Sequence, residues 1–327
     1  MGFSEIIGHK KQIDMLRQAW LNGRLHHAYL FVGPDGIGKK TLALALAQAT
    51  HCTELDDDFC GGCGACRGIQ SGNHADVRVV EPLSGKKEIT IQQVRELEKE
   101  LTLRSFSGRK KIAIIDRATL MNRPAQNALL KTLEEPPQNC ILILIATNAG
   151  GLLPTVRSRV FGLSFGALPR RIVTQFLTSK GKSQQEAEFL AALTMGSLGA
   201  ASKIEKEKLI EKRQGWSDML SSLTPGNYRA ALVSAEAVAA NRDETLMFLE
   251  WAGIWYRDLL TFRITRAWDE IVNQDMLPQI EQQSAHTQEN LLFSLLVKTT
   301  EASRRIQRNV NRRMVIEDLF LEAVEIH

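Results

Sequence analysis

The feature that most constrains this chain is the glycine-rich stretch Gly33-Pro34-Asp35-Gly36-Ile37-Gly38-Lys39-Lys40-Thr41, which directly follows the apolar run 28–32. Glycines let the backbone curl until successive N–H groups point inward at phosphate oxygens, and the helix expected after the loop adds its positive N-terminal end. A lysine at this place reaches the outer phosphates as a point charge. We therefore predict a phosphate-binding loop that uses Gly33, Gly36, Gly38 and Lys39. The alternative is a glycine-rich turn without a ligand.

The part of this loop that holds a metal departs from the usual pattern. A Ser or Thr normally follows the lysine, because its hydroxyl helps to hold Mg²⁺ on the nucleotide. Here that position is Lys40, and Thr41 lies about 100° further around the helix. We expect ATP and Mg²⁺ as possible ligands of a degraded site, to which Thr41 contributes only after a local shift.

Cysteines indicate a second kind of site. Four of the five, Cys52, Cys60, Cys63 and Cys66, crowd into one short segment. Overlapping Cys-x2-Cys spacings with glycines between them allow four thiolates to meet at one tetrahedral centre, and such a closed set predicts a structural Zn²⁺. The alternative is four unliganded buried thiols in a segment that also holds several acids. Cys140 opens an apolar strand and is expected in the core.

Strands and helices alternate up to about residue 166, and the pattern is almost wholly helical beyond it. The runs 111–116 and 141–147 are apolar throughout, as in strands of a parallel sheet that helices cover on both faces. We predict an α/β phosphate-binding domain at 1–166 with the cysteine module at 52–66. A small helical domain at 167–210 and an all-α domain at 211–327 follow.

Polar residues at the ends of these strands are candidate nucleotide contacts. Asp116 ends one apolar strand, where a carboxylate can orient Mg²⁺, but Arg117 stands where a Glu normally activates the attacking water. A cation cannot take a proton from water, so we expect little hydrolysis at this site. A helix cap is an equally good interpretation of Asp116. Thr147 or Asn148 could sense a γ-phosphate, although such residues are more often turn formers.

Composition and charge exclude few classes of function. It has 327 residues, a formal net charge of +4 and a pI near 8.8, which permits nucleic-acid contact without arguing for it. No apolar run approaches the roughly 20 residues of a spanning helix, and the N-terminus shows no export pattern. We therefore expect a cytoplasmic protein.

Two further motifs extend these observations: Asn127-Ala128-Leu129-Leu130-Lys131-Thr132-Leu133-Glu134-Glu135-Pro136-Pro137 and Ser158-Arg159. Together with the loop and the cysteines, they make the chain resemble the clamp loader of bacterial DNA polymerase III, a family of AAA+ ATPases. Val160 replaces the cysteine of the family's Ser-Arg-Cys signature. The resemblance implies an AAA+ domain, a helical lid and a helical collar that holds the subunits in a ring.

By this resemblance Arg159 is the arginine finger, which stabilises charge on ATP bound to a neighbouring subunit. A surface ion pair is the alternative role for Arg159. The family's hydrolysing subunits carry an arginine after the Gly-Ser-Leu turn, where this chain has Gly199. Lys40, Arg117 and Gly199 thus all weaken the chain's own site, whereas Arg159 is kept.

The implied partners are the other AAA+ subunits of the loader, delta and tau or gamma, in a hetero-pentameric ring. The sliding clamp and primer-template DNA are reached through the complex. The implied role is to complete a neighbour's ATPase site rather than to hydrolyse ATP alone. Two alternatives stay open: a self-sufficient ATP-hydrolysing motor subunit or helicase-like ATPase, and a zinc-dependent scaffold without nucleotide.

Overall fold

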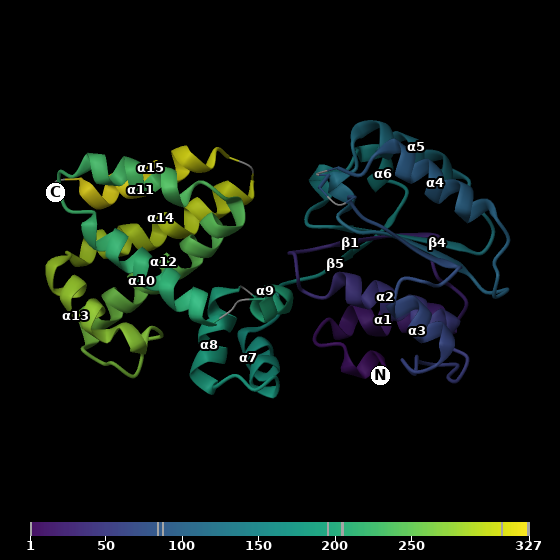
Figure 1. The fold of residues 1–327 in the computed structure, drawn as a ribbon, viewed down its shortest axis with the longest axis horizontal. Coiled ribbons are helices and arrows are strands. Elements are labelled where there is room, and N and C mark those ends of the chain that lie inside the picture. Colours follow the sequence, from purple (N-terminus) through teal and green to yellow (C-terminus); the bar gives the residue numbers. More distant parts are fainter. Residues whose placement is uncertain are drawn as a thin grey trace. The chain divides into compact units, whose positions relative to one another are not determined.

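A five-stranded parallel sheet forms the first half of the computed structural model, which describes residues 2–83, 85–86, 88–194, 196–203, 206–308 and 310–325 (Figure 1). Its strand order is β2-β3-β4-β1-β5, and every neighbouring pair runs parallel. The strands are β1 (Ala28–Val32), β2 (Val77–Val80), β3 (Lys111–Ile115), β4 (Cys140–Ala146) and β5 (Phe161–Ser164). The predicted strands and the predicted parallel arrangement are confirmed.

Helices cover both faces of this sheet, as the apolar runs predicted. Alternate strand residues serve two cores: Phe31, Ile114 and Ile143 pack toward one face, and Leu30, Ile115 and Leu144 toward the other. The first face carries α1 (Lys10–Leu21), α2 (Lys39–His51) and α3 (Gly64–Gln70), and the second carries α4 (Ile91–Thr102), α5 (Arg123–Glu134) and α6 (Pro154–Arg157) (Figure 1). Burial on both faces is why the central strands β1, β3 and β4 consist almost wholly of apolar residues, whereas β2 and β5 at the edges are partly exposed.

Local signals place the helix ends. Thr90 and Gln93 form a reciprocal capping box at the start of α4. The Asn122 side chain accepts the Ala125 amide at the start of α5, and Pro124 lies in the first turn, where its missing N–H costs nothing. Short 3-10 helices span Phe3–Glu5, Ala118–Leu120, Ala149–Gly151 and Gln274–Met276.

The second half of the chain is helical. Its helices are α7 (Arg170–Ser179), α8 (Gln184–Leu193), α9 (Leu198–Lys203), α10 (Lys206–Ser222), α11 (Tyr228–Val238), α12 (Arg242–Thr265), α13 (Leu277–His286), α14 (Glu289–Gln307) and α15 (Arg312–Val324). The long helix α12 lies at the centre of this core. Trp251 and Trp255 stack with ring centroids 5.2 Å apart, and Phe248 meets Phe320 of α15 edge to face. These aromatic side chains are therefore part of the core.

Contacts between Cα atoms divide the chain into two compact units, one of residues 1–172 with 196–199 and one of residues 173–195 with 200–327. The predicted boundary at residue 210 falls inside α10, which is continuous from Lys206 to Ser222. The division into an AAA+ domain, a lid and a collar stays a prediction.

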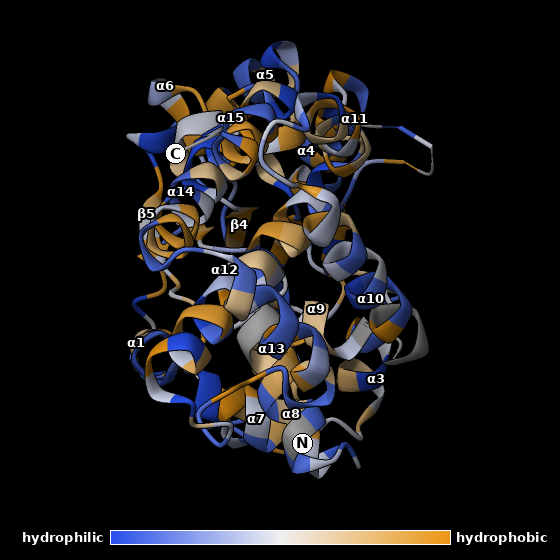
Figure 2. Cartoon of the chain, turned by 90° about the vertical axis from the view of Figure 1, so that its left-hand side faces the viewer, coloured by the Kyte–Doolittle hydropathy of each residue, from blue (hydrophilic) through white to orange (hydrophobic). Residues whose placement is uncertain are grey.

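None of the described helices is both long and apolar enough to cross a membrane. Figure 2 illustrates the reason, since hydrophilic and hydrophobic residues mix along helices such as α10 and α12.

The buried carboxylate of Asp76 organises the loop between α4 and β3. Asp76 is 3% exposed and accepts hydrogen bonds from the Phe106 amide (2.8 Å), the Ser107 amide (2.8 Å), and the Ser107 and Ser105 hydroxyls (2.7 and 3.0 Å). Burial by itself would raise the pKa of Asp76, but the hydrogen bonds from Ser107, Phe106 and Ser105 outweigh it and lower that pKa to about 2. The ionised form is therefore the one that the fold stabilises.

Because the folded pKa of Asp76 is depressed, its contribution to stability is complete above the unfolded pKa near 4 and is lost as the pH falls toward 2. We expect Asp76→Asn to lower the free energy of unfolding by about 2 kcal/mol at pH 7 and by much less at pH 2. Urea unfolding at both pH values measures this. Asp14→Asn, on the exposed face of α1, is the control and should change stability by under about 0.5 kcal/mol. An equal loss in Asp76→Asn at both pH values would contradict the assignment.

Candidate functional site

The glycine-rich loop lies between β1 and α2, as predicted, and its backbone requires glycine. Gly36 and Gly38 have φ of +71° and +104°, in the left-handed region that other residues avoid. A Cβ on Gly33 would lie 2.2 Å from the Phe165 carbonyl oxygen of the strand end beside it. The loop therefore has the shape that a phosphate-binding loop needs at the N-terminus of a helix.

Lys39 is folded back into its own loop. Its side chain is almost fully buried, and Nζ donates to the carbonyl oxygens of Gly33 (2.6 Å) and Pro34 (2.5 Å). Burial lowers the pKa of Lys39, while Asp35 and Asp116 act in the opposite direction. These two carbonyls take two of the three N–H donors of the ammonium.

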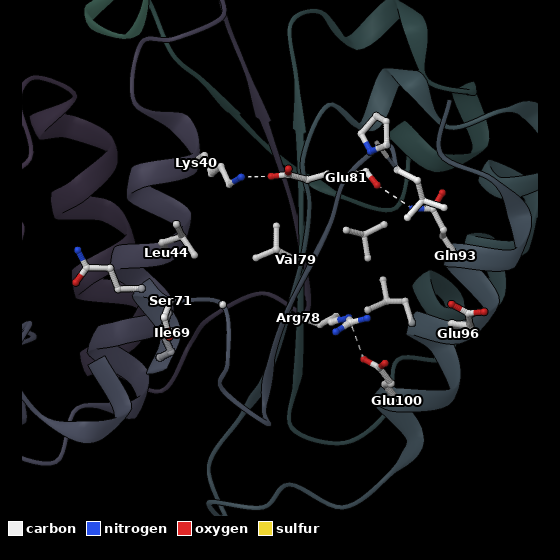
Figure 3. Close-up of a pocket in the computed structure, with 16 residues that line it drawn as sticks. Lys40, Leu44, Ile69, Ser71, Arg78, Val79, Glu81, Gln93, Glu96 and Glu100 are labelled. Atoms are coloured by element: carbon white, nitrogen blue, oxygen red, sulfur yellow. Dashed lines mark hydrogen bonds and ion pairs between the residues drawn. The ribbon is translucent and has the colours of Figure 1, made fainter. Parts of the chain in front are cut away.

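Lys40 occupies the metal side of the loop. Its Nζ pairs with Glu81, after β2 (Figure 3), and also lies 3.5 Å from Oδ2 of Asp116, after β3. Thr41 is exposed on the next position of α2. An ammonium thus stands beside the carboxylate for which a Mg²⁺ contact was predicted, and Glu81 is a partner that sequence reasoning missed.

The other strand-end residues act locally. Oδ1 of Asp116 accepts the Arg117 amide at 2.9 Å, and Arg117 has a φ of +52°. Asn148 accepts the Gly151 amide at 3.0 Å and so caps a 3-10 helix, while Thr147 is exposed. Asp116 therefore accepts the amide of the next residue and lies close to Lys40, whereas no described side chain caps the 3-10 helix Ala118–Leu120 that follows.

The segment 196–199 closes over the phosphate-binding loop. The Gly199 amide donates to the Gly36 carbonyl at 2.8 Å, and a Cβ on Gly199 would lie 3.0 Å from Gly36 Cα. The position at which hydrolysing relatives were expected to carry an arginine thus contacts the loop through backbone alone. Sequence reasoning identified the missing guanidinium but not this contact.

Arg159 lies on the surface just after α6. Nη1 donates to the Thr155 carbonyl (3.0 Å) and the Ser158 hydroxyl (3.2 Å), and Nη2 pairs with Glu134 at the end of α5 (2.7 Å). The Arg159 side chain is 36% exposed and that of Glu134 is 51% exposed. Both roles considered for this residue remain compatible with the structure, because the ion pair exists and the guanidinium is accessible.

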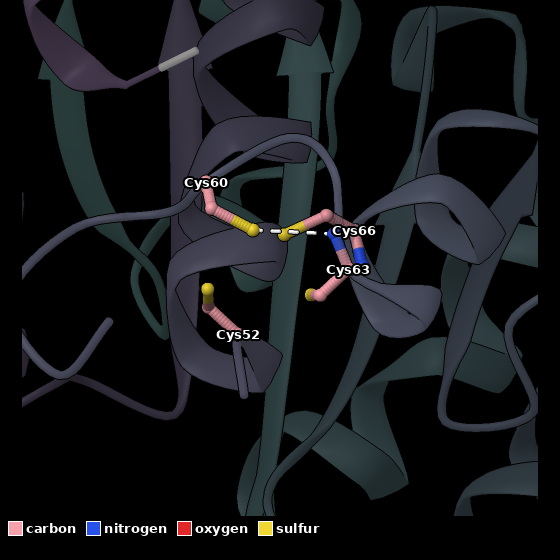
Figure 4. A group of neighbouring side chains, drawn as sticks. All are labelled: Cys52, Cys60, Cys63 and Cys66. Atoms are coloured by element: carbon pink, nitrogen blue, oxygen red, sulfur yellow. Dashed lines mark hydrogen bonds between the residues drawn. The ribbon is translucent and has the colours of Figure 1, made fainter. Parts of the chain in front are cut away.

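The four cysteines converge as their spacing predicted (Figure 4). Cys52 ends α2, Cys63 caps α3, Cys66 lies in α3, and all four sulfurs, including that of Cys60, lie within 4.8 Å of one another. Backbone amides point at two of them: Cys63 N at the Cys60 sulfur (3.2 Å) and Cys66 N at the Cys63 sulfur (3.4 Å). The cluster can therefore hold a metal ion.

The pKa values of these thiols differ. Burial acts to raise the pKa of Cys63, but hydrogen bonds from Thr53 and Cys66 outweigh it and lower that pKa to about 6. For Cys66 burial dominates and raises the pKa to about 12. A bound cation would favour the thiolate at both positions, because it neutralises the charge that burial penalises.

A second cluster, which sequence reasoning missed, joins His51, His74 and Asp76, whose ligand atoms lie within 4.8 Å of one another. The rings of His51 and His74 are 4.6 Å apart, and burial followed by repulsion from His74 lowers the pKa of His51 to about 4. Asp76 already accepts four hydrogen bonds from loop 105–107. We therefore infer that this cluster has a structural role at the edge of the sheet.

Most of the chain matches known protein families and known proteins. The family model described as DNA polymerase III, delta subunit matches residues 8–169, and the model of its C-terminal part matches residues 208–325. DNA polymerase III subunit delta' of Bacillus subtilis is 31% identical over 303 residues, which are 91% of each chain. The Escherichia coli protein of the same name is 27% identical over 95% of this chain and 93% of its own length.

Solved structures also match. The RuvB Holliday junction branch migration motor of Thermotoga maritima matches with a TM-score of 0.43 and 18% identity, over 86% of this chain and 88% of its own. The DNA clamp loader delta protein of Bacillus subtilis matches with a TM-score of 0.35 and 12% identity, over 95% of this chain and 99% of its own.

The geometry of the sulfurs predicts that the chain takes up one thiophilic divalent metal. Titration with Co²⁺ should give thiolate-to-metal absorption that saturates near one equivalent, and Cys60→Ala should weaken binding by at least about tenfold because only three thiolates remain. Cys140→Ala, at the start of β4 and outside the cluster, is the matched control and should bind as the unaltered chain does. Full binding by Cys60→Ala would contradict the cluster as the site.

Proposed function

The chain belongs to the DNA polymerase III delta-prime subunit family, and on this premise we propose that it acts in the bacterial clamp loader by lending Arg159 to the ATPase site of a neighbouring subunit. The observation that carries the proposal is a contrast within one domain. The metal side of the chain's own phosphate site is taken by Lys40, whereas Arg159 is accessible on the surface.

Three features support a weak site in cis. The Lys40 ammonium next to Asp116 would repel Mg²⁺, and two of the three donors of the Lys39 ammonium already bond to loop carbonyls. Gly199 brings no guanidinium to the loop that it contacts. A nucleotide that bound here would therefore lack both the metal and a second cation, which are the groups that stabilise transferring phosphoryl charge.

Arg159 is suited to act in trans. A guanidinium presents several donors in a planar fork that matches phosphate oxygens, and its charge is always present. Its ion pair with Glu134 is exposed, and such pairs contribute only about 0–1 kcal/mol. Replacing Glu134 by the γ-phosphate of a neighbour's ATP therefore costs little free energy. Until the neighbour binds, the ion pair with Glu134 keeps the Arg159 guanidinium in place.

In this role the chain joins delta and tau or gamma subunits in a hetero-pentameric ring in the cytoplasm. The C-terminal helices serve as a collar that holds the ring, and the ring opens the sliding clamp and loads it on primer-template DNA. A structural Zn²⁺ held by Cys52, Cys60, Cys63 and Cys66 stabilises the segment between α2 and α3, and metal analysis of freshly purified, reduced chain tests that identity. Zinc of about one equivalent supports it, and another metal or none contradicts it.

We expect Arg159→Ala to lower the ATPase rate of the assembled loader by roughly 10³-fold, the scale of arginine-finger losses, because charge on the neighbour's transferring phosphoryl group is left unpaired. Steady-state phosphate release by the reconstituted complex with clamp and primed DNA measures it. Arg157→Ala, two residues away and also exposed, is the matched control and should leave the rate unchanged. Gel filtration confirms that both variants assemble, and an unaltered rate in assembled Arg159→Ala would refute the proposal.

The motor-subunit alternative makes the opposite prediction for the isolated chain. We expect no Mg²⁺-dependent ATP hydrolysis above the background without protein, and no change on Lys39→Ala, because Lys40 excludes the metal and Arg117 replaces the general base. Robust hydrolysis by the chain alone that Lys39→Ala abolishes would favour the motor subunit instead.

A further inference from the structure

One edge of the sheet is open and hollowed. Strand β2 ends the order β2-β3-β4-β1-β5, so among the described strands it pairs with β3 alone. A groove of about 560 Å³ runs along its free side, between the α2–α3 wall and α4 (Figure 3). We call this the β2 groove, and its central apolar lining is Leu44, Ile69, Val79, Leu83 and Leu97.

The backbone of β2 presents unpaired groups to this groove. In a parallel pair each residue directs its N–H and C=O to the same side. The carbonyls of Asp76 and Val80 accept amides from β3, at 2.8 and 2.9 Å, so Val77, Val79 and Glu81 face the other way. The Val77 amide donates to the His74 carbonyl, and the Glu81 carbonyl accepts from Gln93.

These contacts leave the Val77 carbonyl, both polar groups of Val79 and the Glu81 amide without a bond within the described part of the chain. Their alternation matches the ladder of an added strand. Open strand edges of this kind are usually blocked or covered, because they pair readily with other chains.

The charged residues at the groove indicate which side chains an added strand would contain. Lys40 pairs with Glu81 at one end, and Arg78 pairs with Glu100 at the other. Glu96 of α4, which lines the groove, accepts only a hydrogen bond from Gln92, and no described cation pairs with it. The groove therefore contains one carboxylate, that of Glu96, without a basic partner among the residues described, and its walls on either side of the strand edge are apolar.

We propose that the β2 groove binds an extended segment of a partner protein, which adds to the sheet beside β2. The segment's backbone pairs with Val77, Val79 and Glu81, its alternate apolar side chains fill the space between Leu44 and Leu97, and a Lys or Arg meets Glu96. Main-chain bonds supply affinity and the side-chain pockets supply selectivity, as in other cases of strand addition. The proposal does not depend on the role of Arg159.

The test selects peptides from a random heptapeptide library displayed on phage, with the full chain as bait. Selected peptides should show apolar residues at alternate positions with a basic residue between them. Val79→Pro removes an amide that faces the groove while leaving the bonds to β3, because proline is tolerated where an edge N–H faces outward. We expect at least about tenfold weaker binding to Val79→Pro than to Val79→Ala, which also shortens the lining side chain but keeps the amide.

A second measurement keeps the proposal testable if Val79→Pro does not fold. In the unaltered chain the amides of Val79 and Glu81 should exchange with solvent quickly, and a selected peptide should slow both. Selection of no peptide above the bare support would overturn the proposal. Equal binding to folded Val79→Pro, or binding that leaves both amides unprotected, would also overturn it.

Discussion

Burial of a parallel sheet on both faces is the constraint from which the rest of the structure follows. Parallel strands need crossover helices, and these cover the faces, so polar groups are confined to the sheet's two ends and its edges. At the carboxyl ends this brings together the phosphate-binding loop after β1, Asp116 after β3 and Asn148 after β4. At the opposite end it places Asp76 against the loop before β3.

A lysine lies between two carboxylates in the carboxyl-end site. The Lys40 ammonium pairs with Glu81 and lies 3.5 Å from Oδ2 of Asp116. Backbone contact between Gly199 and Gly36 then ties segment 196–199 to the loop without a ligand. Both contacts are made within the chain itself.

The cysteine module and the free β2 edge lie outside the site at the carboxyl ends of the strands. The cysteine module fills the connection between α2 and α3, on the face away from Arg159 and α5. The β2 edge is free because no further strand follows it in the order, and α3 and α4 flank it rather than cover it. A metal, a partner's nucleotide and a partner's strand would therefore each have a separate surface of one domain.

The sequence by itself determined the strands, the loop, the cysteine cluster and the loss of the usual metal hydroxyl. These depend on residues close in the chain, such as Asn122 with Ala125 or Cys60 with Cys63, whose geometry follows from local spacing. Only the tertiary structure decided that Glu81 pairs with Lys40, that Glu134 holds Arg159, and that Asp76 binds loop 105–107. The physical reason is that each of these contacts joins segments far apart in sequence. Hydrophobic burial of the whole sheet brings such segments together, and no local pattern encodes which polar side chains then meet.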